Sequence, residues 1–176
     1  MIYRAAVLSG TVAVCFERVE AQPAITDWVE RFASATAYSG FLSFDFIVDA
    51  AGRAMAIECN PRATSGAHFV HQDDLARAVV DPDTTSPVRF RPQLFMQQVF
   101  PCLTETQKSF FSDRPRFRSN LRYLLSARDV TWGAHDPLPL LTMPFTASQI
   151  IARSIAKGES FGEASTFDIT WREPAR

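Results

Sequence analysis

Apolar and polar residues alternate in four short runs near the start of the chain, as they do in strands that are buried on one face. Tyr3–Leu8 and Thr11–Phe16 predict a first hairpin that turns at Ser9-Gly10. Phe41–Val48 and Arg53–Cys59 predict a second hairpin. The N-terminal part of the chain is therefore expected to contain a sheet.

Helical spacing appears between and after these hairpins. Apolar residues in Ile25–Ala37 recur every three or four positions and predict a helix that ends at Gly40. A second helix is predicted over Ala67–Val80. Farther along, Gln93–Cys102 fits either a helix or a strand, and Thr146–Lys157 predicts a helix that the following glycine ends.

This order of elements predicts an α+β fold, in which an antiparallel sheet carries helices on one face. The β signal weakens after residue 81, so we expect a mainly helical C-terminal extension. We accordingly divide the chain into a core domain at residues 1–80 and an extension at residues 81–176 that packs on it.

The second hairpin has one face suited to a core and one face suited to chemistry. Side chains alternate along a strand, so Asp45 shares one face with Ser43 and Ile47. The opposite face is wholly apolar and is expected in the core: Leu42, Phe44, Phe46 and Val48. The next strand also has an apolar face, on which Cys59 is expected to be buried: Met55, Ile57 and Cys59.

The turn decides which residues of the two strands face each other. If Asp49–Gly52 is a four-residue turn, the first pair is Val48 with Arg53. Asp45 and Glu58 are then diagonal neighbours whose backbones lie about 7–8 Å apart. Both acids fall on the face away from the core.

The residues on that face and in the following loop form an oxygen-rich set. Asp45, Glu58 and Asn60 supply two carboxylates and an amide, which suit Mg²⁺, and a cation would offset the repulsion between the acids. Arg62 can form a fork with phosphate or acyl-phosphate oxygens. Ser65 and its neighbours offer hydroxyl and backbone donors just before a predicted helix.

Two segments of the hairpin region, Ser43–Ile47 and Ile57–Gly66, resemble the ATP-grasp superfamily. Glu58 lies 13 positions after Asp45, as in D-alanine–D-alanine ligase, and the Asn-Pro-Arg sequence that begins at Asn60 is similar to carbamoyl-phosphate synthetase. The resemblance implies that Asp45, Glu58 and Asn60 are the metal ligands. Residues 1–80 would then be the C-terminal subdomain of the ATP-grasp fold.

The resemblance also implies a cofactor and a reaction. Arg62 matches the arginine that steadies the transferring phosphoryl group or the acyl phosphate, so it is the candidate catalytic residue. The cofactors would be ATP and Mg²⁺, or Mn²⁺ in its place. Ser65 and Arg62 would join the metal ligands in binding the nucleotide. The chain would be the Mg-ATP-binding half of a carboxylate-amine ligase that acts on a small carboxylate substrate through an acyl-phosphate intermediate.

A looser similarity to a branch of the same superfamily extends along the rest of the chain. It consists of Ala127–Val130, Asp136–Pro139 and Asp168–Trp171. ATP-grasp enzymes also have a preceding subdomain with a phosphate-binding lysine, a lid and an adenine-binding hinge. The lysines here are Lys108 and Lys157, neither on an expected lid. We therefore expect a fragment, a truncated gene product or one piece of a split enzyme. Such a chain would be inactive alone and would need a partner subdomain or subunit to supply the lid.

Two other functions compete with this interpretation. The chain could be a non-catalytic or vestigial interaction module, which would expose an apolar face where the missing subdomain belongs. It could also be a metal-dependent nuclease, since one nuclease class has an Asp on one strand and Glu-x-Lys on the next. Asn60 stands where that lysine would be, which counts against a nuclease.

Composition narrows the partners and the setting. The 18 Lys and Arg residues nearly balance the 19 Asp and Glu residues, so neither nucleic acid nor a membrane is an expected partner. Three cysteines without regular spacing favour a reducing, cytoplasmic setting. His68 and His71 are expected to be surface or capping histidines rather than a metal pair.

Overall fold

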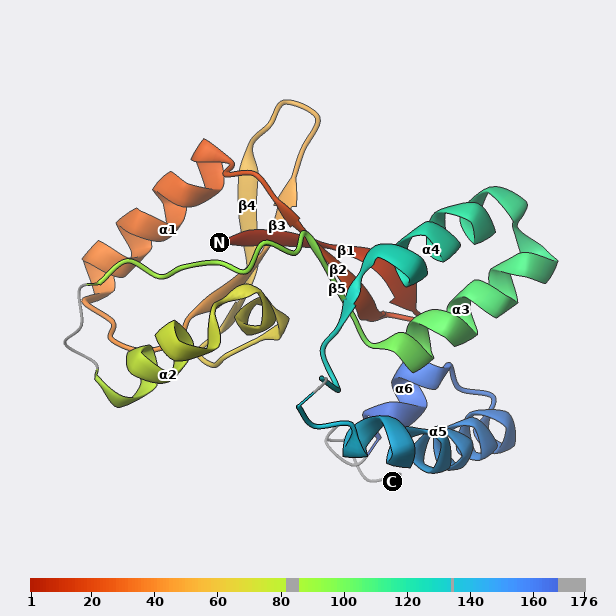
Figure 1. Ribbon diagram of the computed structural model, residues 1–176. Coiled ribbons are helices and arrows are strands. Elements are labelled where there is room, and N and C mark those ends of the chain that lie inside the picture. Colours follow the sequence, from red (N-terminus) through yellow and green to blue (C-terminus); the bar gives the residue numbers. More distant parts are fainter. Residues whose placement is uncertain (82–85, 134, 168–176) are drawn as a thin grey trace, which may run out of the picture. The chain divides into compact units, whose positions relative to one another are not determined.

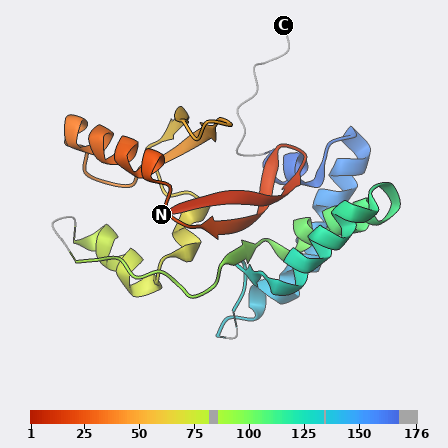
Figure 2. The same ribbon diagram turned by 90° about the horizontal axis from the view of Figure 1, so that it is seen from above.

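Strands and helices combine into an α+β fold with a mainly helical second half, which confirms the predicted class (Figures 1 and 2). The structure is a computed structural model that describes residues 1–81, 86–133 and 135–167. In chain order its elements are β1 (Ile2–Ser9), β2 (Val12–Val19), α1 (Pro23–Thr36), β3 (Ser43–Val48), β4 (Ala54–Asn60), the 3-10 helix η1 (Ser65–Phe69), α2 (Gln72–Val80), β5 (Phe95–Gln97), α3 (Val99–Ser112), α4 (Arg114–Ser126), β6 (Arg128–Asp129), α5 (Leu138–Lys157) and α6 (Phe161–Ser165).

The strands are divided between two sheets. One sheet has four strands in the order β1-β2-β5-β6, and the other consists of β3 and β4 alone. β2 pairs with β5 antiparallel, whereas β5 pairs with β6 parallel. Both predicted hairpins are present, and the turn of the first one contains Gly10 with a φ of 61°, which glycine adopts without strain.

The chain packs as two compact units, which we describe separately. Unit 1 consists of residues 1–3 and 18–92, and unit 2 consists of residues 4–17 and those from 93 onward. Unit 1 contains α1, the β3–β4 hairpin, η1 and α2, while unit 2 contains β5, β6 and the helices from α3 onward. The division predicted from the sequence, a core domain at 1–80 and an extension at 81–176 that packs on it, stays a prediction.

In unit 1, α1 covers one face of the β3–β4 hairpin with aromatic side chains. The Trp28 ring lies 5.1 Å from that of Phe44 and 5.3 Å from that of Phe46, both edge-on. The Phe32 ring lies 4.9 Å from Phe44. Edge-to-face pairs of this kind add to the free energy gained from burying the rings. Phe44 and Phe46 of the predicted core face therefore do pack against a helix, whereas Val48, also predicted in the core, is 43% exposed beside the turn.

The helix predicted over Ala67–Val80 is interrupted at Val70 and His71. Val70 is extended and pairs with Phe90, and the backbone N–H of His71 donates to the Arg89 carbonyl at 2.9 Å. These bonds to a distant segment replace helical ones, so the segment splits into η1 and α2. Sequence periodicity does not reveal such long-range pairing.

A buried carboxylate joins α2 to the segment after it. The Asp74 side chain is inaccessible to solvent and forms ion pairs with Arg77 and Arg89, both at 2.9 Å. The Arg89 backbone N–H donates to the same carboxylate at 2.8 Å. The hydrogen bonds from Arg89, together with the arginine charges, hold the pKa of Asp74 well below its usual range.

Unit 2 is built around buried residues of β1, β2 and α3. Val7, Val14, Cys15 and Cys102 form its central cluster. A hydrogen bond with Cys102, together with burial, raises the pKa of Cys15, so this thiol stays neutral inside the core. The Ser9 hydroxyl donates to Glu105 at 2.9 Å and accepts the Gly162 backbone N–H at 3.2 Å, which ties β1 to α3 and α6.

Among the described residues, no helix has the length and apolar character needed to cross a membrane. The cytoplasmic setting stays a prediction.

Replacing Phe69 with alanine tests the core of unit 1. Phe69 is fully buried, and its ring centroid lies 6.2 Å from that of Tyr3. We expect Phe69→Ala to lower the free energy of unfolding by about 3–5 kcal/mol, because the substitution leaves a cavity. Urea denaturation followed by circular dichroism measures this. Phe111→Ala is the control, since Phe111 is 86% exposed and its loss should change stability by no more than about 0.5 kcal/mol.

The lowered pKa of Asp74 predicts a pH dependence of stability. A carboxyl whose pKa is lower in the folded state stabilises the fold above its unfolded pKa, about 3.9, and this stabilisation is lost as the pH falls toward the folded pKa. We therefore expect Asp74→Asn to be less stable than the wild type at neutral pH, with the difference narrowing below about pH 4. Denaturation at several pH values tests this, and a difference that does not change with pH would contradict it.

Candidate functional site

The turn of the β3–β4 hairpin is organised by Asp49. Its carboxylate accepts the backbone N–H groups of Ala51 and Arg53, both at 2.9 Å, and the Arg53 guanidinium at 2.7 Å. The bonds from Arg53 lower the pKa of Asp49. The backbone N–H of Asp49 also donates to the Arg53 carbonyl at 3.1 Å, and Gly52 has a φ of 79°.

This turn differs from the predicted one by a single residue. The predicted pair, Val48 with Arg53, is wrong, because Val48 lies opposite Ala54. Five residues thus separate the paired strand ends. With an odd number, the odd positions of β3 share a face with the odd positions of β4, whereas the predicted turn pairs them with the even positions. Continued without interruption, this register would place Asp45 opposite Ile57.

Farther from the turn, a β-bulge at Ile57 again places odd positions of β3 beside even positions of β4. Phe46 pairs with Ala56, but the next pair is Asp45 with Glu58, so Ile57 is an extra residue on β4. Asp45 and Glu58 are therefore directly opposed rather than diagonal. Directly opposed residues have Cβ atoms about 4.5–5.5 Å apart. The two acids are thus closer than the predicted register places them.

The predicted ligands share one face of the hairpin. Asn60 lies opposite Ser43, next to the Asp45–Glu58 pair and on the face away from α1. Asp45 and Glu58 are exposed, and the Asn60 side-chain N–H donates to a Glu58 oxygen at 2.9 Å. The bulge therefore brings two carboxylates and an amide together.

The second predicted apolar face does not form a core. Met55 lies opposite Ile47 and so shares the face of Asp45, where it is 50% exposed. Ile57 is 61% exposed, and Cys59, predicted to be buried, is exposed. The odd turn and the bulge explain these errors, because together they split the residues that a regular strand would place on one face.

The loop that carries Arg62 is held by hydroxyl groups. The Thr64 hydroxyl lies 2.9 Å from that of Ser43 and 3.1 Å from that of Tyr3. Gly66 packs directly on the tyrosine, where an added Cβ would meet the Tyr3 ring at 2.9 Å. These contacts hold the loop just after Arg62. Alternation along the strand could suggest Ser43, but no sequence signal points to Tyr3.

Arg62 and Ser65 lie on either side of this anchor. Arg62 is exposed, and its guanidinium makes one long bond of 3.4 Å to the Ala63 carbonyl. Ser65 is half-buried and begins η1, a 3-10 helix of five residues, whereas α2 begins only at Gln72. Ser65 therefore does not precede the long helix that the sequence predicts.

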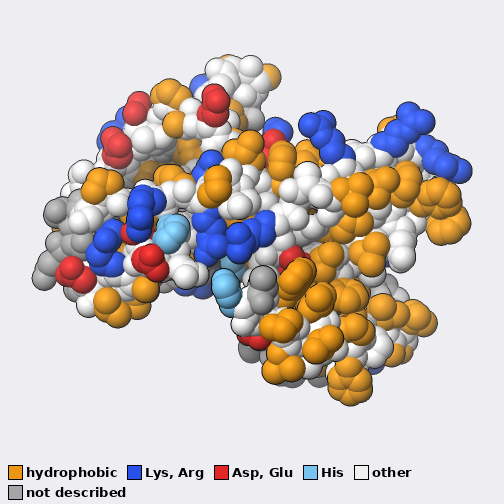
Figure 3. Space-filling view, in the orientation of Figure 1, with side chains coloured by type: hydrophobic (Ala, Val, Ile, Leu, Met, Phe, Trp, Pro, Cys, Tyr) orange, Lys and Arg blue, Asp and Glu red, His pale blue; other side chains and the backbone are white. Residues whose placement is uncertain are grey.

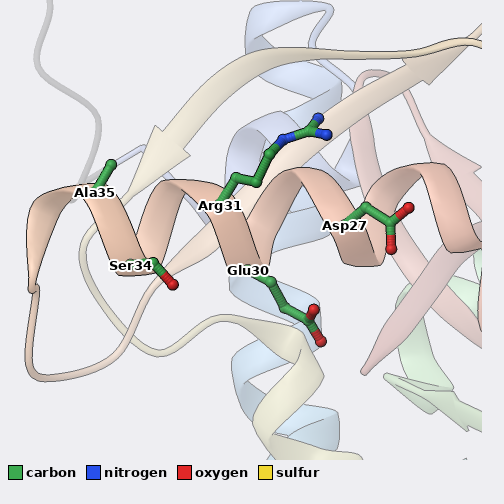
Figure 4. A pocket seen from close by; sticks show the side chains of 5 residues that line it. All are labelled: Asp27, Glu30, Arg31, Ser34 and Ala35. Atoms are coloured by element: carbon green, nitrogen blue, oxygen red, sulfur yellow. The ribbon is translucent and has the colours of Figure 1, made fainter.

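Other features of the described chain do not add to this set. The pocket in Figure 4 is lined by exposed residues of α1 alone, none of them a predicted ligand: Asp27, Glu30, Arg31, Ser34 and Ala35. Within the described ranges, no three His, Cys, Asp or Glu side chains are grouped to hold a metal. The candidate set has two acids, so it relies on the Asn60 amide and on ligand oxygens.

The segments of the looser resemblance have structural roles where they are described. The Asp129 carboxylate accepts the Val99 backbone N–H at 2.8 Å, and Asp136–Pro139 leads into α5. Asp168–Trp171 lies outside the described residues. Lys108 forms an ion pair with Glu105 at 2.9 Å.

Replacing Thr64 with valine tests the anchor of the Arg62 loop. The substitution keeps the shape of the side chain but removes both hydroxyl contacts, so we expect the free energy of unfolding to fall by about 1–3 kcal/mol. Hydrogen exchange in the loop should also become faster. Thr36→Val, at the exposed end of α1, is the matched control. Equal effects of the two substitutions would contradict an anchoring role for Thr64.

Comparisons with protein-family models, with curated proteins and with solved structures find no match to this chain.

Proposed function

We propose that this chain is the Mg-ATP-binding half of an ATP-dependent carboxylate-amine ligase of the ATP-grasp type. The observation that carries the proposal is the direct opposition of Asp45 and Glu58, with Asn60 beside them. The resemblance of Asp45 and of Ile57–Gly66 to the ATP-grasp motif supports a role for these three residues in binding the metal.

Electrostatics favours a cation between the two acids. Like charges directly opposed across a hairpin destabilise it. Among the described residues, neither Asp45 nor Glu58 forms an ion pair, so no protein cation offsets the repulsion. A divalent cation would offset it, and two carboxylates with an amide oxygen are the hard ligands that Mg²⁺ or Mn²⁺ takes. The donor set thus fits the proposed metal.

The residues would divide the work among them. Asp45, Glu58 and Asn60 would hold the metal, with the Asn60 amide turning its oxygen instead of its N–H toward the ion. A metal held by these residues would supply positive charge that offsets the negative charge developing during phosphoryl transfer to the carboxylate. Arg62, exposed on an anchored loop, would steady the transferred phosphoryl group or the acyl phosphate, and Ser65 would contact the nucleotide.

Apolar side chains beside the acids support a larger binding surface. Ile47 and Met55 share the face of Asp45, and each is about half exposed. An apolar surface next to metal ligands suits an adenine ring or a partner subdomain that closes over the nucleotide. We propose that a partner subdomain or subunit supplies the lid and binds the small carboxylate substrate.

The same apolar side chains favour a second candidate, a non-catalytic interaction module. Ile47, Met55 and Ile57 on the hairpin could bind a partner protein without any nucleotide. The two functions differ in their need for Mg²⁺, because an apolar contact between proteins does not depend on a divalent ion.

Calorimetric titration of Mg²⁺ with a non-hydrolysable ATP analogue tests the proposal. We expect weak binding that requires Mg²⁺, and at least a tenfold loss of affinity, about 1.4 kcal/mol, in the Asp45→Asn, Glu58→Gln double variant. Arg62→Gln should weaken binding of the nucleotide but not remove its dependence on Mg²⁺.

The matched control is the Asp27→Asn, Glu30→Gln double variant. It removes one Asp charge and one Glu charge from the exposed face of α1, and it should bind the nucleotide like the wild type. Equal loss of affinity in both double variants would show that only overall charge matters, which contradicts a hairpin site. A folded wild-type chain that binds no nucleotide would favour the interaction module.

A further inference from the structure

Two arginines of unit 1 are held together without an acidic partner. The Arg18 guanidinium donates to the backbone carbonyl of Arg91 at 2.8 Å. Within the described ranges, neither of them forms an ion pair. Both side chains are half-buried, which makes unneutralised positive charge more costly than on an open surface.

Each guanidinium is oriented by the structure and keeps free donors. The Nε of Arg91 donates to the Val70 carbonyl at 3.0 Å. Among the described residues its two terminal nitrogens form no hydrogen bond, so they can form a fork with an anion. One terminal nitrogen of Arg18 donates to the backbone carbonyl of Arg91. The Arg18 guanidinium lies over the Phe90 ring, with its Cζ 5.9 Å from the ring centroid. Oriented donors lose little conformational entropy when they bind an anion.

The neighbouring arginines have an acidic partner, which sets the Arg18–Arg91 pair apart. Arg77 and Arg89 both pair with the buried Asp74. Asp74 thus gives both of them an opposite charge at 2.9 Å, whereas no described acid forms an ion pair with Arg18 or Arg91. In the view of Figure 3, Lys and Arg side chains gather near the centre, with His side chains beside them.

A histidine lies on the segment beside Arg91, since the Arg91 backbone N–H donates to the carbonyl of Phe69, the residue after His68, at 2.8 Å. His68, in η1, has its pKa lowered by desolvation and by the positive charge of Arg91. An anion bound between them would reverse this effect, and His68 would then add a further donor.

We propose that Arg18, Arg91 and His68 form a binding site for a small anion that carries carboxylate or phosphate oxygens. Planar guanidinium groups match both kinds of group through paired hydrogen bonds. None of these residues belongs to the metal set on the hairpin, so the site does not depend on the proposed ligase activity. It would take a small molecule with at least two negative charges, which balance the two arginines.

Titration of the whole chain with citrate and, separately, with inorganic phosphate tests the site at constant ionic strength and without Mg²⁺ or nucleotide. We expect at least one of them to bind with a Kd below about 10 mM, and Arg18→Gln and Arg91→Gln each to weaken this binding about tenfold or more. Binding of citrate alone identifies a carboxylate ligand, of phosphate alone a phosphate ligand, and of both a general oxyanion site.

Arg114→Gln is the matched control, because Arg114 also lies over a phenylalanine ring, at 4.6 Å from that of Phe110, but belongs to unit 2. It should bind like the wild type. Lack of binding by the wild type, or equal binding by all four proteins, would overturn the proposal.

A second readout needs no substitution. Proton NMR titration of the wild type should show that the bound anion raises the pKa of His68 relative to the same protein in chloride. An unchanged His68 titration with citrate and phosphate would contradict the site even if some binding were seen. This measurement keeps the test valid if an arginine variant does not fold.

Discussion

The extra residue at Ile57 determines which side chains face each other across the β3–β4 hairpin. The odd-length turn would place Asp45 opposite an isoleucine, and the bulge places it opposite Glu58 instead. The aromatic rings under α1 keep β3 oriented, since Phe44 and Phe46 must face Trp28. Packing fixes one face of the hairpin and the bulge shifts its register, so the two acids lie opposite each other on the open face.

Unit 1 contains charged residues that form ion pairs and charged residues that do not. Asp49 and Asp74 receive several hydrogen bonds from backbone and arginine, and each has a lowered pKa, as expected of acids that stabilise a fold. In the described part of the chain, neither the Asp45–Glu58 pair nor the Arg18–Arg91 pair forms an ion pair with an opposite charge. A charged group that the fold leaves without an opposite charge attracts a ligand of opposite charge. Both proposals follow from this contrast.

Sequence reasoning predicted the local features of this molecule well. Alternation identified the apolar face with Phe44 and Phe46, and helical spacing identified α1, because both depend on neighbouring residues alone. It did not predict the bulge at Ile57 or the break at Val70, since each is set by pairing with another segment. The prediction that Asp45 and Glu58 share a face agreed with the structure only because the missed turn length and the missed bulge offset each other.

The anchoring of the Arg62 loop was equally out of reach of the sequence. Tyr3 lies 61 positions before Thr64, and nothing in its own surroundings marks it as a partner of that loop. The identity of Asp45, Glu58, Asn60 and Arg62 as candidates came from motif resemblance and residue chemistry, whereas their mutual geometry required the three-dimensional structure.

The most direct test of the central claim is to locate a bound divalent ion on the hairpin. Mn²⁺ added with an ATP analogue broadens the NMR signals of nearby backbone amides, so the broadened signals mark its position. Our account predicts that the amides of Asp45, Glu58 and Asn60 broaden first, and that Mg²⁺ in excess reverses the effect. Broadening centred on another part of the chain, or hairpin signals that do not change, would contradict it.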